Sequence, residues 1–364
     1  MNTTQAITHH RTEAPILSIR KVSLSYGSEA VLNDISINIK QGEISCILGP
    51  SGSGKTTLLR AIAGFVPVAS GQIDINGERV SDSKAIKPPN ERSVGVVFQD
   101  FALFPHLTVQ QNIEFGLGKL PKAEKHKRAQ QYMQIMDIEP LSHKYPADLS
   151  GGQQQRVAIA RAVAPEPDLL LMDEAFSALD PTLREKVARD VRQIIQKLGL
   201  TAILVTHDQQ EAFAFADTIV VVANNCLQQF SSAYDLYHKP KTFFVAKFIG
   251  EGAFIEGKAF KQEKGWFAKT SLGTLRLPQR LSGELYSSDK TVKILLRPDD
   301  VLHDDASPTK AIIEEKHFRG AFIRYQLRLP VTNEKVLCFA PSHHNHAIGE
   351  TFGIRAEVEH VICF

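Results

Sequence analysis

One glycine-rich segment constrains this chain more than any other part of it. It reads Gly49-Pro50-Ser51-Gly52-Ser53-Gly54-Lys55-Thr56, followed by Thr57, and it fits the spacing G-x-x-x-x-G-K-[ST] at every fixed position. The apolar run Glu43 to Leu48 indicates a strand before the segment, and the pattern of Thr57 to Ala63 indicates a helix after it. A strand, a glycine loop and a helix start bring backbone N–H groups together around an anion. The segment therefore predicts a phosphate-binding loop.

Each residue type in this loop suits a nucleotide phosphate. The glycines let the backbone approach phosphate oxygens without a Cβ in the way. We expect the Lys55 amine to reach the β- and γ-phosphates, and the Thr56 hydroxyl to ligate Mg²⁺. An ordinary glycine-rich turn is the alternative, but it does not explain why every fixed position and both flanks agree.

Length and composition set the outer limits. A chain of 364 residues predicts two domains, and 43% hydrophobic with 23% charged residues is typical of a globular protein. The 42 Lys and Arg against 40 Asp and Glu argue against a protein that coats nucleic acid. No apolar run approaches the roughly 18 residues of a membrane span, and no h-region predicts export. The four cysteines form no C-x-x-C pair, which favours thiols in a reducing cytoplasm.

The residues on both sides of the loop predict a small antiparallel sheet. Residues 1–14 are polar and aperiodic and predict a disordered tail. Apolar and polar residues alternate from Ile35 to Ile39 and again from Gln72 to Ile75, before the hairpin signal Asn76-Gly77. Tyr26 has two interpretations: a ring that stacks on adenine, or a strand-end aromatic side chain that packs locally.

Three apolar runs beyond the loop end in polar side chains. The runs are Val94 to Phe98, Leu169 to Met172 and Ala202 to Val205. Gln99 follows the first run, and its amide could lie near Mg²⁺ or an attacking water. Asp173 and Glu174 end the second, where we expect Asp173 to hold Mg²⁺ through water and Glu174 to polarise the attacking water. His207 follows the third and either contacts the γ-phosphate, orients Glu174 or is merely structural.

The sequence from about residue 100 to 165 predicts a mostly helical region. It opens with four large apolar side chains in a loop: Phe101, Leu103, Phe104 and Leu107. They either form a docking surface for a partner or cover the domain's own core. The basic run Lys119 to Arg128 predicts the solvated face of a helix.

A second glycine-rich segment starts another helix. Leu149-Ser150-Gly151-Gly152-Gln153 precedes a helix that we expect to run to Val163 and to stop at Pro165. It is a second anion-binding helix start, for which a chain with one phosphate loop has no evident use. Further on, Asp180 is expected to cap a helix with Pro181 at its first position.

Taken together, residues 15–240 closely resemble the nucleotide-binding domain of ATP-binding-cassette (ABC) transporters. The resemblance rests on the phosphate loop, Gln99, Leu149 to Gln153, Asp173-Glu174, Ala178 to Asp180 and His207, in the family's order. It implies a RecA-like α/β core with an antiparallel β subdomain and a helical subdomain. One departure is Ala175, where such families usually have Pro after the catalytic Glu.

The resemblance also explains the second helix start. Two such domains pack head to tail, and each ATP lies between the phosphate loop of one copy and the Leu-Ser-Gly-Gly-Gln signature of the other. The implied catalytic residues are Glu174, His207 and Gln99, and the implied Mg²⁺ ligands are Thr56, Gln99 and Asp173. The implied ATP-binding residues are Tyr26, Gly49, Pro50, Ser51, Gly52, Ser53, Gly54, Lys55, Thr56, Thr57, Ser150, Gly151, Gly152, Gln153 and Asp180.

For function, the resemblance implies an ATPase that energises a bacterial importer as a homodimer. It would lie at the cytoplasmic face of the inner membrane, where the loop after Gln99 receives a short helix of a permease subunit. A periplasmic substrate-binding protein is implied as an indirect partner. No binding of nucleic acid is expected. A soluble ABC ATPase that acts on ribosomes or DNA is one alternative. Ribosomal members carry two cassettes and DNA-repair members carry a long coiled-coil insertion, and this sequence shows neither feature. A non-catalytic regulatory module is the other alternative, and intact Glu174 and His207 argue against it.

Residues 241–364 predict a separate β-rich domain. Its strand-like stretches are Val292 to Leu296, Ile323 to Leu329 and Ile354 to Val361. With Leu296-Arg297-Pro298, this part resembles the OB-like (TOBE) β-barrel regulatory domain of bacterial import ATPases for sugars, polyamines, sulfate and ferric iron.

Short motifs suggest a substrate. Gly116-Leu117-Gly118 and Phe248-Ile249-Gly250-Glu251-Gly252 look most like the ferric-ion importers, so ferric iron is expected, with sugar, polyamine or sulfate as the alternatives. His343, His344 and His346 are expected in a solvated loop rather than a metal site, because no carboxylate or Cys accompanies them in sequence.

Overall fold

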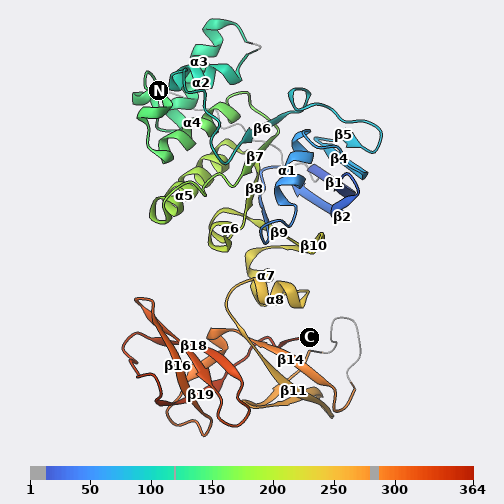
Figure 1. Cartoon of the computed structure of the whole chain (residues 1–364), viewed down its shortest axis with the longest axis vertical. Helices are drawn as coiled ribbons and strands as arrows, with labels where there is room; N and C mark the ends of the chain where they lie inside the picture. Colours follow the sequence, from blue (N-terminus) through green and yellow to red (C-terminus); the bar gives the residue numbers. More distant parts are fainter. Residues whose placement is uncertain (1–13, 119, 279–286) are drawn as a thin grey trace, which may run out of the picture. The chain divides into compact units, whose positions relative to one another are not determined.

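The computed structural model describes residues 14–118, 120–278 and 287–364, which form two compact units divided between Ala233 and Tyr234 (Figure 1). The division falls at the start of helix α7 (Ala233–His238). The domain boundary at residue 240 from the sequence lies just after that helix and stays a prediction. The expected disordered tail lies outside the described residues, apart from Ala14.

The N-terminal unit begins with a four-stranded antiparallel sheet of order β2-β1-β4-β5. Its strands are β1 (Pro15–Tyr26), β2 (Glu29–Lys40), β4 (Ser70–Ile75) and β5 (Glu78–Asp82). The alternation from Ile35 to Ile39 lies in β2, with the isoleucines buried, as predicted. Asn76 and Gly77 turn β4 into β5 with φ of 48° and 77°, the left-handed conformation of a tight hairpin turn.

A six-stranded sheet of order β10-β9-β3-β8-β7-β6 forms the centre of this unit. Its strands are β3 (Ile44–Leu48), β6 (Val94–Val97), β7 (Leu169–Asp173), β8 (Thr201–Thr206), β9 (Thr218–Ala223) and β10 (Cys226–Ser231). All pairs are parallel except β9 with β10. Strand β7 is buried on both faces, because Leu169 and Leu171 pack in one hydrophobic core and Leu170 and Met172 in the other. A continuous apolar run is what such a strand requires.

Helices cover both faces of this sheet (Figure 1). They are α1 (Lys55–Ala63), α2 (Val109–Gly116), α3 (Lys122–Ile135), α4 (Gly151–Val163), α5 (Pro181–Leu198) and α6 (Gln209–Phe215), with 3₁₀ turns at Pro89–Glu91, Glu139–Leu141 and Pro146–Asp148. Helix α1 belongs to the core that includes the antiparallel sheet, whereas α2 to α5 belong to the core on the other face. Helix α1 starts two residues earlier than the sequence pattern indicated, so Lys55 opens it.

The C-terminal unit contains two five-stranded sheets around one core, as the sequence predicted for an all-β domain. One has the order β13-β12-β11-β14-β20 and the other β15-β19-β16-β17-β18. The strands are β11 (Ala253–Gln262), β12 (Gly265–Thr270), β13 (Gly273–Arg276), β14 (Thr291–Leu296), β15 (Val301–His303), β16 (Lys310–Phe318), β17 (Phe322–Arg328), β18 (Lys335–Pro341), β19 (Thr351–Ala356) and β20 (Ile362–Cys363), beside α7, α8 (Phe243–Phe248) and a 3₁₀ turn at Pro298–Asp300.

One predicted strand is wrong in extent. The stretch from Ile354 to Val361 was expected to be a single strand, but β19 ends at Ala356. Its partner β15 is only three residues long, and the pair Val301–Ala356 is the last one that β15 offers. Beyond it the chain crosses to the other sheet, where β20 pairs with β14.

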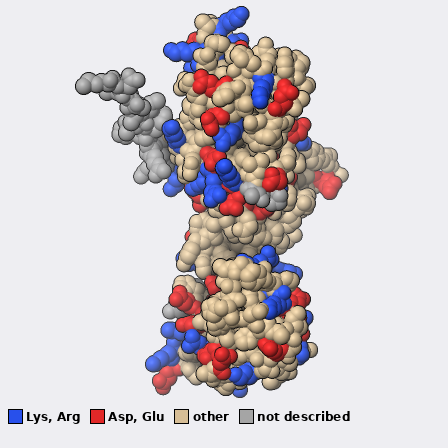
Figure 2. All heavy atoms as spheres, turned by 90° about the vertical axis from the view of Figure 1, so that its left-hand side faces the viewer, with Lys and Arg blue, Asp and Glu red and all other residues tan. Residues whose placement is uncertain are grey.

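The surface carries both signs of charge. On the face drawn in Figure 2, Lys and Arg are interspersed with Asp and Glu over both units, in keeping with a net charge of +2. Within the described ranges, no helix combines the length and the apolar character that crossing a bilayer requires.

Candidate nucleotide-binding site

The candidate residues gather at one edge of the six-stranded sheet. The register pairs Leu48 with Thr206, Asp173 with Val205 and Val97 with Met172, so β3, β8, β7 and β6 end at nearly the same level. The phosphate loop, His207, Asp173-Glu174 and Gln99 each follow one of these ends. Ligands of parallel α/β sheets bind at this carboxyl edge.

The loop closes so tightly that two of its glycines are required. A Cβ on Gly49 would lie 2.1 Å from the carbonyl oxygen of Val222 in β9, a distance that no side chain tolerates. Gly54 has a φ of 90° and a Cβ there would lie 2.9 Å from the side chains of Val31 and Leu32 in β2. Only glycine therefore fits at these two positions, because the loop packs directly against β9 and β2.

Lys55 is buried at the start of α1, with a relative exposure of 5%. Its Nζ donates hydrogen bonds to the carbonyl oxygens of Gly49, at 2.9 Å, and Pro50, at 2.8 Å. Burial lowers the pKa of its ammonium group, and the nearby carboxylates of Glu174 and Asp173 act in the opposite direction. The charge is thus held inside the loop, where a phosphate would meet it.

Thr56 and Asp173 join the loop to the end of β7. The Thr56 hydroxyl donates a hydrogen bond of 2.9 Å to Oδ1 of Asp173. Burial raises the pKa of the Asp173 carboxyl, whereas the Thr56 hydrogen bond acts to lower it. A hydroxyl beside a buried carboxylate is an oxygen-rich pair of the kind that Mg²⁺ prefers.

Glu174 and His207 form the second pair at this edge. Nδ1 of His207 lies 3.2 Å from Oε1 of Glu174. The backbone of Glu174 is left-handed, with a φ of 45°, and its N–H donates to the Val205 carbonyl at 2.9 Å. Such strain in a non-glycine residue persists only where the surroundings hold it. Asp173 bonds Thr56 whereas Glu174 lies next to His207, so the two adjacent acids have different partners.

The donors of the loop fit a magnesium nucleotide triphosphate. The Ser53 hydroxyl is buried and has no hydrogen-bond partner among the described residues. A buried polar group without a partner is costly, and a phosphate oxygen at the bare backbone near Gly49 would satisfy it. With Lys55 for charge and the Thr56–Asp173 pair for a hard cation, the residues present match the ligand that the motif predicts.

Gln99 and Tyr26 are exposed. Gln99 lies two residues beyond the last residue of β6, at the same edge as Asp173. Tyr26 ends β1 with 53% of its surface exposed, so both interpretations of this ring stay open. Both side chains remain open to a ligand, and their predicted contacts stay predictions.

The signature sequence starts α4 as predicted. Ser150 caps the helix: its Oγ accepts from the Gln153 N–H at 3.4 Å, and Gln153 Oε1 accepts from the Ser150 N–H at 3.0 Å. Gly152 is buried against α5, where a Cβ would lie 3.4 Å from Val187. This helix start rests on one hydrophobic core, and the phosphate loop rests on the other.

Arg184 is a residue of this region that sequence reasoning missed. Asp180 caps α5 as expected, since its Oδ1 accepts from the Leu183 N–H at 3.0 Å. Arg184 donates to the carbonyls of Ser177 and Leu179, at 3.2 and 3.0 Å, and lies 3.6 Å from Asp208. It therefore ties the loop before α5 to the residue next to His207. No local pattern in the sequence signals such a link.

The apolar loop after Gln99 covers part of its own domain and leaves another part near the surface, where docking stays a prediction. Phe101 is buried in the core of α2 to α5, so part of the loop covers its own domain. Phe104 is half-buried and packs on Phe115, with ring centroids 4.3 Å apart, and Phe115 is 60% exposed. Arg161 lies over the Phe104 ring at 5.5 Å and donates to the carbonyls of Phe101 and Ala102. We call Phe104, Phe115 and Arg161 the aromatic patch.

Comparisons with known proteins agree with this geometry. Residues 32–177 match the family model described as ABC transporter, and residues 294–364 match the TOBE domain. A spermidine/putrescine import ATP-binding protein, PotA, of Oleidesulfovibrio alaskensis is 39% identical over 327 residues, which cover 88% of this chain and 86% of that protein. The chain belongs to the ATP-binding subunits of ABC transporters.

Further relatives place it among the importers of that family. The PotA protein of Pasteurella multocida is 37% identical over 339 residues, covering 89% of this chain and 88% of that protein. The solved structure of cbiO1 from Clostridium perfringens, part of the ABC transporter complex cbiONQ, matches with a TM-score of 0.57 and 32% identity. It covers 65% of this chain and 93% of cbiO1. The chain is thus the ATPase subunit of an ABC importer, with a C-terminal TOBE domain.

The comparisons do not support ferric iron as the substrate. The short glycine motifs that suggested it make packing contacts within the chain. A Cβ on Gly116 would lie 2.7 Å from the Arg161 carbonyl, and one on Gly252 would lie 2.9 Å from Leu295. The Glu251 carboxylate pairs with Arg324. These residues are required by the packing of the chain itself, which explains why they do not report the transported substrate.

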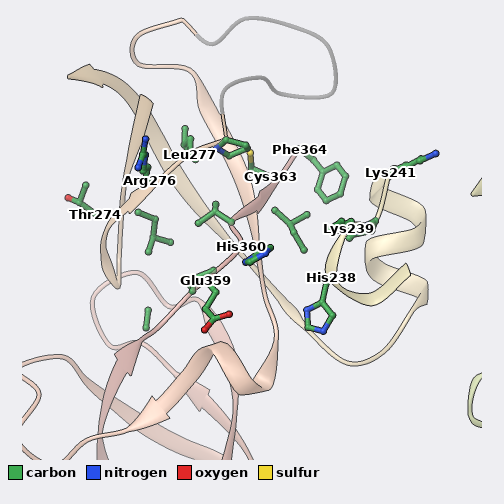
Figure 3. A pocket seen from close by; sticks show the side chains of 17 residues that line it. His238, Lys239, Lys241, Thr274, Arg276, Leu277, Glu359, His360, Cys363 and Phe364 are labelled. Atoms are coloured by element: carbon green, nitrogen blue, oxygen red, sulfur yellow. The ribbon is translucent and has the colours of Figure 1, made fainter. Parts of the chain in front are cut away.

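A separate cavity of about 980 Å³ lies within the C-terminal unit. In Figure 3, Arg276 and Leu277 line one side of it, His238 and Lys239 the other, and His360 lies between them. All of its lining residues come from 238–364, so it is distinct from the nucleotide site.

Proposed function

We propose that this importer subunit energises the uptake of polyamines of the spermidine and putrescine class. One observation carries the proposal: the similarity to spermidine/putrescine import proteins extends over 88% of the chain and so includes both units. Polyamine was an alternative in the sequence analysis, and the similarity favours it over ferric iron. The substrate itself would be recognised by other subunits, because this chain acts on ATP.

In the proposed mechanism, the phosphate loop and Lys55 hold the β- and γ-phosphates of ATP. Thr56, Asp173 and Gln99 would hold Mg²⁺, which neutralises charge on the phosphate oxygens when bound. Glu174 would accept the proton of the attacking water, and His207, at 3.2 Å from it, would keep the carboxylate aimed. Tyr26 would stack on the adenine. Hydrolysis then yields ADP and phosphate.

We further propose that the working form is a homodimer. Helices α1 and α4 pack on opposite faces of the central sheet. Each copy therefore offers a phosphate loop at the start of α1 and, separately, the signature sequence at the start of α4. Ser150 to Gln153 of one copy, with Asp180 nearby, would contact the ATP held by the other. Two composite sites would result, as a symmetric head-to-tail pair requires.

The aromatic patch is the proposed contact with a permease subunit. Phe115 exposes 60% of its surface and packs on the half-buried Phe104, so two aromatic rings lie together where a partner would cover them. A short helix of the permease, at the cytoplasmic face of the inner membrane, would fit such a surface. A periplasmic substrate-binding protein would then be an indirect partner.

Uptake assays test the substrate. In a strain that lacks this gene, uptake of labelled spermidine and putrescine is expected to fall and to return with the wild-type gene but not with Glu174→Gln. Uptake of Fe³⁺ is the matched control and should be unchanged. Loss of Fe³⁺ uptake with normal polyamine uptake would reverse the substrate assignment without touching the ATPase mechanism.

A further inference from the structure

Three histidines from two distant segments meet in the C-terminal unit. His303 ends β15, and His344 and His346 lie in the loop between β18 and β19. One ring nitrogen of each lies within 4.8 Å of the others. Nδ1 of His303 is 2.8 Å from Nδ1 of His344, and their rings meet edge to face. The fold thus creates a cluster that the sequence spacing does not reveal.

Two carboxylates lie next to the histidine cluster in the folded chain. The sequence predicts a solvated loop, because no carboxylate or Cys accompanies His343, His344 and His346 in the pattern. That reason does not hold, because Oδ1 of Asp305 lies 2.9 Å from Nε2 of His303. A second carboxylate, that of Glu350, lies 3.4 Å from Nδ1 of His346. His343 is exposed, as expected, and is not one of the three.

Packing holds the three rings in place. The side chain of His303 is only 8% exposed, and its ring stacks on the buried Phe352 with centroids 4.2 Å apart. The hydroxyl of the buried Tyr325 donates to the His344 carbonyl at 2.7 Å and accepts from the His346 N–H at 3.0 Å. The loop is therefore fixed on both sides of residue 345 before any ligand binds.

We propose that His303, His344 and His346 form a binding site for a divalent transition-metal ion of the zinc class. Imidazole nitrogens are preferred ligands of Zn²⁺, Ni²⁺ and Cu²⁺. Nitrogens bonded to Zn²⁺ at ~2.0–2.1 Å in a tetrahedron lie about 3.3 Å apart. One pair here is 2.8 Å apart and all three atoms lie within 4.8 Å of one another, so small ring rotations suffice. Asp305 occupies the place of the carboxylate that orients a metal-bound histidine. Three protein ligands leave a fourth position for water.

The site is independent of the nucleotide site, since all its residues belong to the C-terminal unit. Bound metal would join β15 to the loop 342–350 and so stabilise the folded barrel by mass action. The proposal therefore stands or falls separately from ATP hydrolysis and from the identity of the transported substrate.

Zinc titration of the metal-free, full-length protein tests the proposal. All proteins carry His9→Gln and His10→Gln, so that the N-terminal histidines cannot contribute. We expect one equivalent of Zn²⁺ to bind by calorimetry and to raise the thermal unfolding midpoint. The double variant His344→Gln/His346→Gln is expected to bind at least ~10-fold more weakly, in line with the effects of disturbing metal sites. His343→Gln is the matched control in the same loop and should bind as the parent does.

Cobalt supplies a second readout. Co²⁺ in a histidine site of low coordination number gives a visible absorption band, which we expect in the parent protein and not in the double variant. Circular dichroism of the metal-free proteins shows whether both have the same fold, and basal ATPase activity should be equal. The proposal is overturned if the parent binds no Zn²⁺, if the double variant binds as tightly, or if His343→Gln weakens binding equally.

Discussion

Nδ1 of His207, at the end of β8, lies 3.2 Å from Oε1 of Glu174, at the end of the neighbouring strand β7. The pair joins an imidazole that is half-exposed to a carboxylate held on a left-handed backbone. Each residue lies one position beyond its strand, and β7 and β8 are hydrogen-bonded neighbours, so the sheet brings the two backbones close together.

Replacing Glu174 is therefore expected to stop turnover without preventing ATP binding. Glu174→Gln should lower kcat by about 10²- to 10⁴-fold, the usual contribution of a general base, with little change in the Kd of MgATP. His207→Ala should act in the same direction. Glu185→Gln, an exposed acid on α5, is the control and should match wild type. Phosphate release and a fluorescent ATP analogue measure the two quantities; unchanged turnover in Glu174→Gln would remove it from the mechanism.

Mixing two inactive variants tests the composite site. Lys55→Ala loses a charged phosphate donor, which should cost about 1.5–3 kcal/mol of ATP affinity, and Ser150→Arg blocks the signature end. If each site draws on both copies, a mixed dimer keeps one intact site, and activity should reappear on mixing. Lys127→Ala, on the exposed face of α3, is the control for loss of charge alone. Should mixtures stay as inactive as their components, the head-to-tail dimer is wrong.

Glu211 should make the stability of the N-terminal unit depend on pH. Burial raises the pKa of its carboxyl above the ordinary value of 4.5, whereas the hydrogen bond from Thr206 acts to lower it. The folded state then holds this proton to higher pH than the unfolded state, so its contribution to stability is lost as pH rises through the folded pKa. Glu211→Gln cannot titrate and keeps an oxygen for Thr206.

The measurement compares urea unfolding at about pH 5 and about pH 7.5, which lie above the ordinary pKa of carboxyl groups; other shifted groups such as Asp173 are common to both proteins. The wild type should lose more stability than Glu211→Gln between these two values. The Glu185→Gln protein should follow the wild type. Identical pH profiles for the wild type and Glu211→Gln would show that the carboxyl of Glu211 titrates normally.

Two glycines of one motif should respond differently to substitution. A Cβ at residue 116 would lie 2.7 Å from the Arg161 carbonyl, whereas one at residue 118 would meet nothing closer than 3.7 Å. Gly116→Ala is expected to destabilise by about 1–3 kcal/mol, as overpacking does, and Gly118→Ala to change stability by less than about 0.5 kcal/mol. Thermal unfolding measures both. Equal effects would mean that the motif is not a packing requirement.

Local patterns predicted most of the fold because its signals are short in range. The phosphate loop, the alternation in β2 and the apolar run of β7 each reveal their structure within about ten residues. The parallel register then brings Gln99, Glu174 and His207 to the edge that their positions after strands indicated. The common location of these residues was predictable for this reason, whereas their roles stay predictions that rest on the family resemblance.

What escaped prediction depends on contacts between distant segments. Arg184 lies 3.6 Å from Asp208, 24 residues later, and His303 meets His344 across 41 residues of sequence. Strand β19 ends early because its partner β15 is short, and the sequence of β19 itself carries no information about the length of β15. The transported substrate escaped as well: two of the glycines used for that inference, Gly116 and Gly252, are required by packing.

Helix α4 has fixed attachments at both ends. At its start Ser150 forms the capping box, and in its last turn Arg161 holds the carbonyls of Phe101 and Ala102, at 2.9 and 2.7 Å. Thirteen helical residues span about 20 Å. The helix is a stiff rod between the signature and the loop beneath Phe104, so a tilt that draws one end toward a phosphate must displace the other.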